Sequence, residues 1–337
     1  YVIDYISGLL VKETPEEIEA VQPFSKILVA DYGYPRENIH TRPQYRVKVR
    51  PSDTKKEYPV DIAVFSGADH TDDAAYIIVE CKKKNRKDGR SQLEDYLRFS
   101  KAYLGVWFNG EERLYLQKIE KDGRILFEEI PNIPRYGERV EDIGKFKRKD
   151  LKPAENLKPT FKTIRNYLAA NAVGITRDEV FASQLINIIF CKIYDERFTR
   201  PNDTVSFRAG VNEKDEDVFA RVLELFKKVK RQYNDVIDVA DSIQLDPRCV
   251  KYIVGELQLY SLKDSSRDAV GEAFEIFIGP SLKGAQGQFF TPRNVVNMVV
   301  NMIDPDTDEK ILEKTLSTLT VSYTHSEPTR QEAISYA

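Results

Sequence analysis

Short runs of hydrophobic residues dominate the first 120 residues of the chain and predict strands with a few helices between them. Residues 61–65 and 76–79 are continuous β-favouring runs, as expected for strands buried on both faces, whereas residues 45–49 alternate polar and apolar side chains. Apolar side chains recur at helical spacing over residues 91–104. Residues 105–116 have the pattern of a hairpin around an Asn-Gly turn. This order of elements predicts an α/β domain with a mixed central sheet flanked by helices.

A first helix is predicted over residues 14–32. Thr14 is a suitable N-cap, Pro15 fits the first helical position, and Glu17 lies where its side chain can complete a capping box. Pro23 removes a backbone N–H in the middle of this helix and is expected to strain it.

The second half of the chain has a different pattern. Proline and charged residues are frequent over residues 131–159 and hydrophobic periodicity fades there, which predicts a linker. Beyond the linker, apolar residues recur at helical spacing, which predicts an all-α helical domain. The expected helices cover residues 161–172, 177–197, 216–233, 247–259 and 269–282.

Composition narrows the class of protein. The chain has 337 residues, of which 41% are hydrophobic and 31% charged, enough for about two folded domains. No run approaches 18 uncharged apolar residues and the start lacks a signal peptide, so we expect no membrane association. Three widely separated cysteines indicate a reducing, cytoplasmic location and exclude a disulfide scaffold. The three histidines are too scattered in the sequence to suggest a histidine-built metal site.

The net charge of −3 conceals basic stretches. Residues 82–101 contain eight Lys or Arg against three Asp or Glu, and residues 144–165 contain eight against two. Such stretches permit a phosphate-bearing partner, although solvated loops have the same composition.

Three charged residues at the ends of two predicted strands form the sharpest local pattern. Glu80 and Lys82 are two positions apart on one strand, so their side chains leave the same face. Asp61 begins the preceding strand, and a hairpin-like pairing would bring its carboxylate next to Glu80. Two carboxylates, a backbone carbonyl such as that of Cys81, and water would form a hard oxygen site for Mg²⁺. With Lys82 as a nearby cation, these parts suit phosphodiester hydrolysis.

A solvated ion pair between Glu80 and Lys82 is the competing interpretation, because both residue types are common on sheets. Two features favour the chemical interpretation. Charged residues are rarely buried, so a charged pair directly after a buried strand indicates a specific role for its side chains. In addition, Gln92 and Tyr96 are four residues apart on the next helix, where both can reach a phosphate or the lysine.

These residues resemble the PD-(D/E)xK nuclease core with its Q-x-x-x-Y extension, which is typical of the N-terminal nuclease domain of type I restriction subunits. The resemblance covers residues 1–120, and Val60 splits the Pro-Asp pair, as is frequent in such nucleases. The motifs that carry it are Asp61, Glu80-Cys81-Lys82 and Gln92-x-x-x-Tyr96.

The resemblance implies a Mg²⁺-dependent endodeoxyribonuclease that acts on double-stranded DNA, with Mn²⁺ as an alternative cation. Asp61, Glu80 and the backbone carbonyl of Cys81 would hold the metal. Some members use a glutamate of the first helix near the metal, and Glu17 is the matching candidate, although the capping box explains it equally well.

The resemblance also implies the roles of the remaining residues. Lys82 would assist the attacking water, and Gln92 and Tyr96 would support the phosphate. DNA contacts would come from the basic run Lys83, Lys84, Arg86, Lys87 and Arg90.

A second resemblance lies near the C-terminus. Residues 287–293, Gly-Gln-Phe-Phe-Thr-Pro-Arg, are similar to the G-x-[FY]-[FY]-T-P segment of adenine-N6 DNA methyltransferases, which packs on S-adenosylmethionine. A helix N-terminus with Thr291 as N-cap and Pro292 at the first position is compatible with the same residues. The implied cofactor-binding residues, in the complete enzyme only, are Phe289, Phe290, Thr291 and Pro292.

The methyltransferase pattern is incomplete in this chain. No glycine follows Gly287 to form the loop that would cradle the cofactor, and no N-P-P-[YF] motif occurs. We therefore expect neither S-adenosylmethionine binding nor methyl transfer by these 337 residues, and we expect the target-recognition module to lie elsewhere. Residues 321–330 resemble translated adapter sequence, so residues 313–337 are expected to be non-native or unfolded. The start at Tyr1 instead of Met predicts a processed or incomplete chain.

Together these patterns predict the front part of a type IIG-like restriction-modification enzyme that is truncated at its C-terminus. An alternative is a non-catalytic DNA-binding or assembly module in which the acids and the lysine are relics; another makes the methyltransferase the main activity. The expected parts are a nuclease domain at 1–130, a linker at 131–159, a helical connector at 160–286, the start of a methyltransferase at 287–312 and a non-native tail at 313–337.

Overall fold

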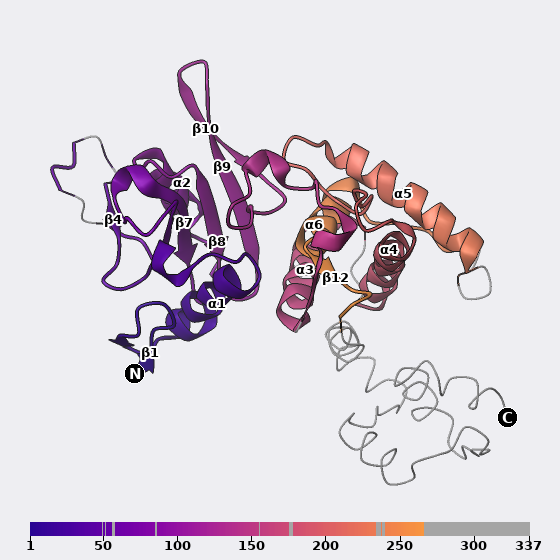
Figure 1. Ribbon diagram of the computed structural model, residues 1–337, viewed down its shortest axis with the longest axis horizontal. Coiled ribbons are helices and arrows are strands. Elements are labelled where there is room, and N and C mark those ends of the chain that lie inside the picture. Colours follow the sequence, from indigo (N-terminus) through magenta and orange to yellow (C-terminus); the bar gives the residue numbers. More distant parts are fainter. Residues whose placement is uncertain are drawn as a thin grey trace, which may run out of the picture.

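The computed structural model describes residues 1–265, apart from residues 49, 51, 56–57, 85, 155, 175–177, 234–236 and 238–239. A sheet with helices around it forms the N-terminal part, and a group of helices lies beside it (Figure 1). The predicted helix over 269–282, the segment over 287–312 and the tail over 313–337 lie outside the described residues.

A six-stranded mixed sheet organises the first part of the chain, in the strand order β10-β9-β8-β7-β6-β3. Neighbouring strands are antiparallel except β7 and β8, which run parallel and therefore need a crossover connection, supplied by helix α2. The predicted mixed sheet is thus confirmed. The strands are β3 (Ile39–His40), β6 (Ile62–Phe65), β7 (Ala75–Cys81), β8 (Leu104–Phe108), β9 (Arg113–Lys121) and β10 (Arg124–Glu129).

Alternate side chains of the sheet pack against two different helices. Val79 and its neighbours on one face pack on α1 (Gln22–Ala30), and Ile78 and its neighbours on the other face pack on α2 (Arg90–Arg98). Because both faces are covered, the central strands β6, β7 and β8 are mostly apolar, as the continuous hydrophobic runs predict. The same alternation fixes which side chains at the strand ends point toward α2.

The first helix differs from its prediction. A π-helical turn, η1 (Glu17–Val21), precedes α1. Pro23 therefore lies in the first turn of α1, where its missing backbone N–H breaks no helical hydrogen bond. Thr14 Oγ1 accepts a hydrogen bond from the Glu17 N–H at 3.1 Å, so the predicted N-cap contact is present. The Glu17 side chain instead binds Gln22, so it does not complete the capping box.

The second helix is shorter than its pattern suggested. It ends at Arg98, and Leu104, which was expected on its apolar stripe, begins β8. Lys118 of β9 donates hydrogen bonds to the carbonyls of Leu97 and Ser100, both at 2.8 Å, and so satisfies two groups at the end of α2. This tertiary contact, rather than hydrophobic spacing, sets the helix boundary.

The β8–β9 hairpin is confirmed, but its connection is longer than a two-residue turn. Phe108 pairs with Arg113, which leaves four residues in the loop, and Gly110 has a φ of 82°. A Cβ at Gly110 would meet the backbone carbonyl of Glu19, so only glycine fits this approach to the first helix.

The second part of the described chain consists mainly of helices, at the predicted places. A short parallel pair, β11 (Lys152–Pro153) with β12 (Tyr260–Ser261), joins the segment before the helices to the segment after them. No helix of the described residues is long and apolar enough to cross a membrane. The helices are α3 (Lys158–Asn171), α4 (Asp178–Phe198), α5 (Asp215–Gln232) and α6 (Pro247–Leu257).

Two further short pairs lie outside the main sheet. β1 (Val2–Ile3) pairs with β2 (Leu10–Val11), and β4 (Arg46–Val47) pairs with β5 (Tyr58–Pro59), both antiparallel. Of the run predicted over 45–49, Arg46 and Val47 therefore belong to a small ribbon outside the main sheet.

The segment over residues 131–159 is irregular but packed. It contains two 3-10 turns, Val140–Asp142 and Arg148–Asp150, and its Ile133 and Phe146 side chains are buried in the core on the α1 face. The connection between the two parts is therefore held against the sheet domain by apolar contacts.

A buried ion pair joins the two parts directly. Arg113 Nη1 of β9 lies 3.3 Å from Glu256 Oε2 of α6, and the two side chains are only 4% and 1% exposed. Burial raises the pKa of Glu256, while the Arg113 charge opposes that shift. Removal of either charge would leave the other buried without its partner.

We predict that Glu256→Ala lowers the free energy of unfolding by about 3–5 kcal/mol, because Arg113 is left as an unpaired buried charge. The double variant Arg113→Met/Glu256→Leu should regain most of this loss, since no charge is then buried. Urea denaturation measures both. Glu224→Ala, which breaks an exposed pair with Lys227, is the control and should change stability little. Equal effects of Glu256→Ala and Glu224→Ala would contradict the assignment.

Candidate active site

Two carboxylates meet where β6 begins and β7 ends. Ile62 pairs with Val79 in the antiparallel register, which places Asp61, the residue before β6, beside Glu80. Asp61 Oδ2 accepts a hydrogen bond from the Cys81 N–H at 2.8 Å. The end of the strand pair is thus closed by the side chain of Asp61.

A row of side chains runs from Glu80 to helix α2. Lys82 Nζ forms an ion pair with Glu80 Oε1 and donates to Gln92 Oε1 at 3.3 Å. Gln92 Nε2 in turn donates to the Tyr96 hydroxyl at 2.7 Å. The structure therefore brings Asp61, Glu80, Lys82, Gln92 and Tyr96 together on the α2 face of the sheet.

Burial raises the pKa of both carboxylates above its ordinary value. Glu80 is 1% exposed; burial, together with the charge of Asp61, raises its pKa to about 8, although Lys82 opposes the shift. Burial also raises the pKa of Asp61 to about 6, against the hydrogen bond from the Cys81 N–H. Burial lowers the pKa of Lys82, but its hydrogen bond to Glu80 outweighs this and raises it overall. Two acids this close cannot both ionise without a compensating positive charge.

The oxygens of this pair fit a hard cation. Glu80 Oε2 is buried and has no hydrogen-bond partner among the described residues. Asp61 Oδ1 receives only a long contact there, 3.5 Å from Gln44 Nε2. In the described part of the chain, no group of three or more His, Cys, Asp or Glu side chains is arranged to hold a metal. A cation at this place would therefore use the two carboxylates, the nearby Cys81 carbonyl and water.

The first helix presents a different acid from the one its pattern suggested. Glu17 is buried and accepts hydrogen bonds from Gln22 Nε2 at 2.7 Å and from Arg42 at 2.5 Å. The negative charge of Glu16, in contrast, contributes to the raised pKa of both Asp61 and Glu80. Neighbouring helical residues differ by about 100° in direction. The sequence pattern alone does not distinguish these two neighbouring acids.

The turn after β3 supplies two groups that sequence analysis missed. Gln44 contacts Asp61, and the positive charge of Arg42 lowers the Asp61 pKa. Both lie in an irregular segment without periodicity, so no local pattern marks them.

The basic run after Lys82 is largely compensated by acids. Among its predicted DNA-binding residues, Lys83 is exposed and has no ion pair to another described residue. The others pair with carboxylates: Lys84 with Glu19, Arg86 with Asp88, Lys87 with Glu112, and Arg90 with Glu94 and Glu129.

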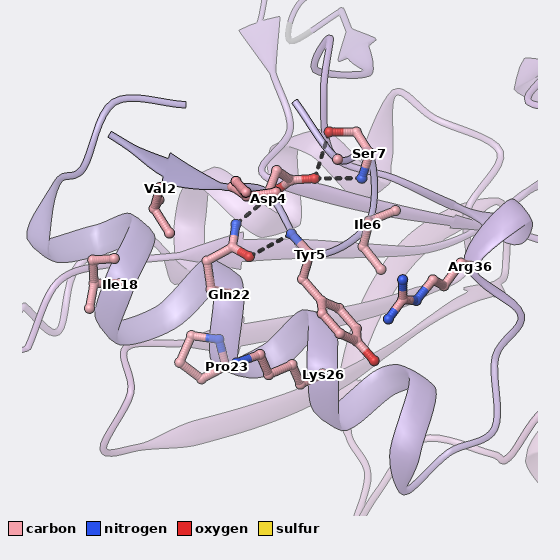
Figure 2. Close-up of a pocket in the computed structure, with 12 residues that line it drawn as sticks. Val2, Asp4, Tyr5, Ile6, Ser7, Ile18, Gln22, Pro23, Lys26 and Arg36 are labelled. Atoms are coloured by element: carbon pink, nitrogen blue, oxygen red, sulfur yellow. Dashed lines mark hydrogen bonds between the residues drawn. The ribbon is translucent and has the colours of Figure 1, made fainter. Parts of the chain in front are cut away.

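A separate pocket of about 570 Å³ lies under the N-terminal segment, and no residue of the carboxylate pair lines it. Figure 2 shows Tyr5 between Lys26 and Arg36, with the Arg36 guanidinium 4.0 Å from the ring centre. Asp4 is buried and bonded to Ser7 and Gln22, so its carboxylate serves the fold of this segment.

Comparison with known proteins gives two matches, to different parts of the chain. Residues 15–134 match the family model for the type I restriction enzyme R protein N terminus, and residues 265–323 match that for N-6 DNA methylase. No curated protein and no solved structure matches the chain significantly. The two matches confirm the predicted combination and support a role in restriction-modification. The second match lies almost entirely outside the described residues.

We predict that Glu80→Gln gains stability relative to the unsubstituted protein as pH rises from 5 to 8 in EDTA. The folded-state pKa of Glu80, about 8, exceeds its ordinary value of 4.5, so the folded protein retains a proton that the unfolded chain releases, and stability falls across this window. Glutamine does not ionise, so the variant lacks this pH-dependent loss of folding stability, which is on the order of 1–4 kcal/mol. Thermal unfolding at several pH values measures it, with the exposed Glu120→Gln as control. A difference in stability between the variant and the parent that stays constant from pH 5 to pH 8 would refute the prediction.

Proposed function

We propose that the N-terminal part of this chain is the Mg²⁺-dependent DNA endonuclease of a restriction-modification enzyme, fused to the beginning of an N6-adenine methyltransferase. One observation carries the proposal. Two buried carboxylates lie side by side with a lysine within reach, and one of their oxygens, Glu80 Oε2, has no partner among the described residues. A purely structural ion pair needs one acid, not two buried side by side whose pKa values are both raised.

The metal would be held by Asp61, Glu80 and the Cys81 carbonyl, with the charge of Glu16 nearby. When bound, Mg²⁺ would supply Lewis-acid stabilisation of a phosphoryl oxygen and lower the pKa of a bound water. Glu17, bonded to Gln22 and Arg42, would keep the first helix and the turn after β3 in place.

Lys82, Gln92 and Tyr96 would act by orienting the nucleophile and the phosphate. The Lys82 ammonium has three hydrogens, of which Glu80 and Gln92 take two in the described part of the chain, so the third would orient water or a phosphate oxygen. Tyr96 fixes the amide of Gln92 and thereby the direction of the lysine. The row from Tyr96 to Glu80 is therefore proposed as the support of the nucleophile.

The methyltransferase part of the proposal rests on the N-6 DNA methylase match over residues 265–323. S-adenosylmethionine would be the cofactor of the complete enzyme, with Phe289, Phe290, Thr291 and Pro292 against it. Double-stranded DNA would be the substrate of both activities. A module outside these residues would read the target sequence.

A non-catalytic DNA-binding or assembly module is the alternative. It predicts DNA binding without hydrolysis and no response of the chain to divalent cations. Metal-dependent cleavage and its loss on substitution of the acids separate the two functions.

We predict that cleavage or nicking of supercoiled DNA requires Mg²⁺ or Mn²⁺ and is abolished by the near-isosteric variants Asp61→Asn and Glu80→Gln. Lys82→Ala should lower kcat by about 10²–10³-fold, because it removes one positioned donor. Glu120→Gln, exposed on β9, is the matched control and should cleave normally. Circular dichroism should show the same fold in all variants. Full cleavage in EDTA, or by Asp61→Asn, would exclude this mechanism.

We predict that DNA binding weakens with salt and that Lys83 contributes more to this dependence than Arg86. Each phosphate neutralised contributes about −0.9 to the slope of log K against log salt. Lys83→Ala should therefore reduce the slope by about 0.9. Arg86→Ala should change it less, because Asp88 already neutralises that arginine. Fluorescence anisotropy over a salt series measures both slopes. Identical slopes for the parent and Lys83→Ala would show that Lys83 does not contact DNA.

A further inference from the structure

Two histidines that are 30 residues apart in the sequence face each other beside the sheet. His40 is the last residue of β3, and His70 lies in the loop between β6 and β7. Their Nδ1 atoms are 3.0 Å apart, and their ring centres are 4.9 Å apart. The two rings do not belong to the carboxylate site.

The other nitrogen of each ring is held by the backbone. His70 Nε2 lies 2.8 Å from the carbonyl oxygen of Glu37, and His40 Nε2 contacts the carbonyl oxygen of Pro43. A carbonyl oxygen only accepts, so both Nε2 atoms must carry hydrogen. In a neutral imidazole the opposite nitrogen then has a lone pair. Two lone pairs thus converge across 3.0 Å, which is repulsive unless a positive centre lies between them.

A metal ion satisfies this arrangement. Histidines that bind metal generally donate their second ring N–H to a carbonyl or carboxylate, which fixes the tautomer and the direction of the lone pair. The Phe65 ring stacks on His70 at 4.6 Å and 24° and restricts its rotation. Burial, together with the neighbouring His70, lowers the pKa of His40, which keeps its lone pair available at neutral pH.

The charged side chains near His40 and His70 do not form a metal-binding group with them in the described part of the chain, so the two rings would be the protein ligands. The loop that carries His70 also carries Asp69, Asp72 and Asp73, but Asp72 accepts a hydrogen bond from Tyr45 at 2.7 Å. Within the described ranges, no third His, Cys, Asp or Glu side chain joins the two rings in a metal-binding group. Water would therefore complete the coordination.

We propose that His40 and His70 form a two-histidine site for a borderline divalent transition metal such as Zn²⁺. Imidazole nitrogens suit Zn²⁺, Cu²⁺ and Ni²⁺, whereas Mg²⁺ requires oxygen ligands, so this site is chemically distinct from the carboxylate pair. The bound ion would join the loop after β6 to the turn after β3. That turn carries Arg42 and Gln44, so the ion would hold both beside Asp61. The proposal does not depend on nuclease activity.

The test is zinc titration of the metal-free full chain by isothermal calorimetry, in the presence of saturating Mg²⁺ to occupy the carboxylates. The unsubstituted protein should bind one Zn²⁺ and show a higher Tm with it. His40→Gln and His70→Gln should each weaken binding at least tenfold and abolish the Tm rise. The controls Glu120→Gln and His325→Gln should bind as the parent does. Binding should also weaken below pH 6, where protons compete for the rings.

Two results would overturn the proposal. Zinc binding that is unchanged in both His40→Gln and His70→Gln would place the ion elsewhere. Absence of zinc binding by the folded parent would show that the positive centre is a proton shared by the two rings, which ¹⁵N spectra of the imidazoles would reveal directly. Circular dichroism of each variant distinguishes lost ligands from lost fold.

Discussion

Desolvation of two neighbouring carboxylates is the constraint around which this part of the molecule is arranged. An isolated buried carboxylate costs several kcal/mol, and a second one beside it adds repulsion. The surroundings compensate with a backbone N–H from Cys81, the ammonium of Lys82 and the charge of Arg42. The compensation is incomplete, because the pKa values of Asp61 and Glu80 stay raised. A site that is electrostatically unsatisfied when it holds no cation is suited to binding one.

The same end of the sheet also meets the helical part of the chain. Phe108 of β8 accepts a hydrogen bond from the Lys82 N–H and pairs with Arg113, whose side chain reaches Glu256 of α6. In the β8–β9 loop, Glu111 forms an ion pair with Lys162 of α3 at 2.8 Å. Lys82 is thus bonded to β8, and β8 is the neighbour of β9, the strand whose Arg113 contacts the helices.

The family matches and the site geometry support the same function from independent directions. The match over residues 15–134 rests on sequence, while the convergence of Asp61, Glu80 and Lys82 rests on strand register. The basic run is less simple than its composition suggests. Most of its members are paired with acids, so net charge in a sequence window overestimates the positive surface that DNA would meet.

The sequence by itself determined the central strands β6 to β9, the helices α3 to α6 and the face that Glu80 and Lys82 share, because side-chain alternation and helical spacing are local properties. It did not predict the edge strands β3 and β10 or the ends of the first two helices. Tertiary structure alone decided which distant groups meet. The β6–β7 register brought Asp61 to Glu80, and the charge of Glu16, not that of Glu17, contributes to the raised pKa of Asp61. The histidines, too scattered in sequence to suggest a metal site, face each other only because β3 pairs with β6. Contacts across strands depend on register and loop path, which no local pattern encodes.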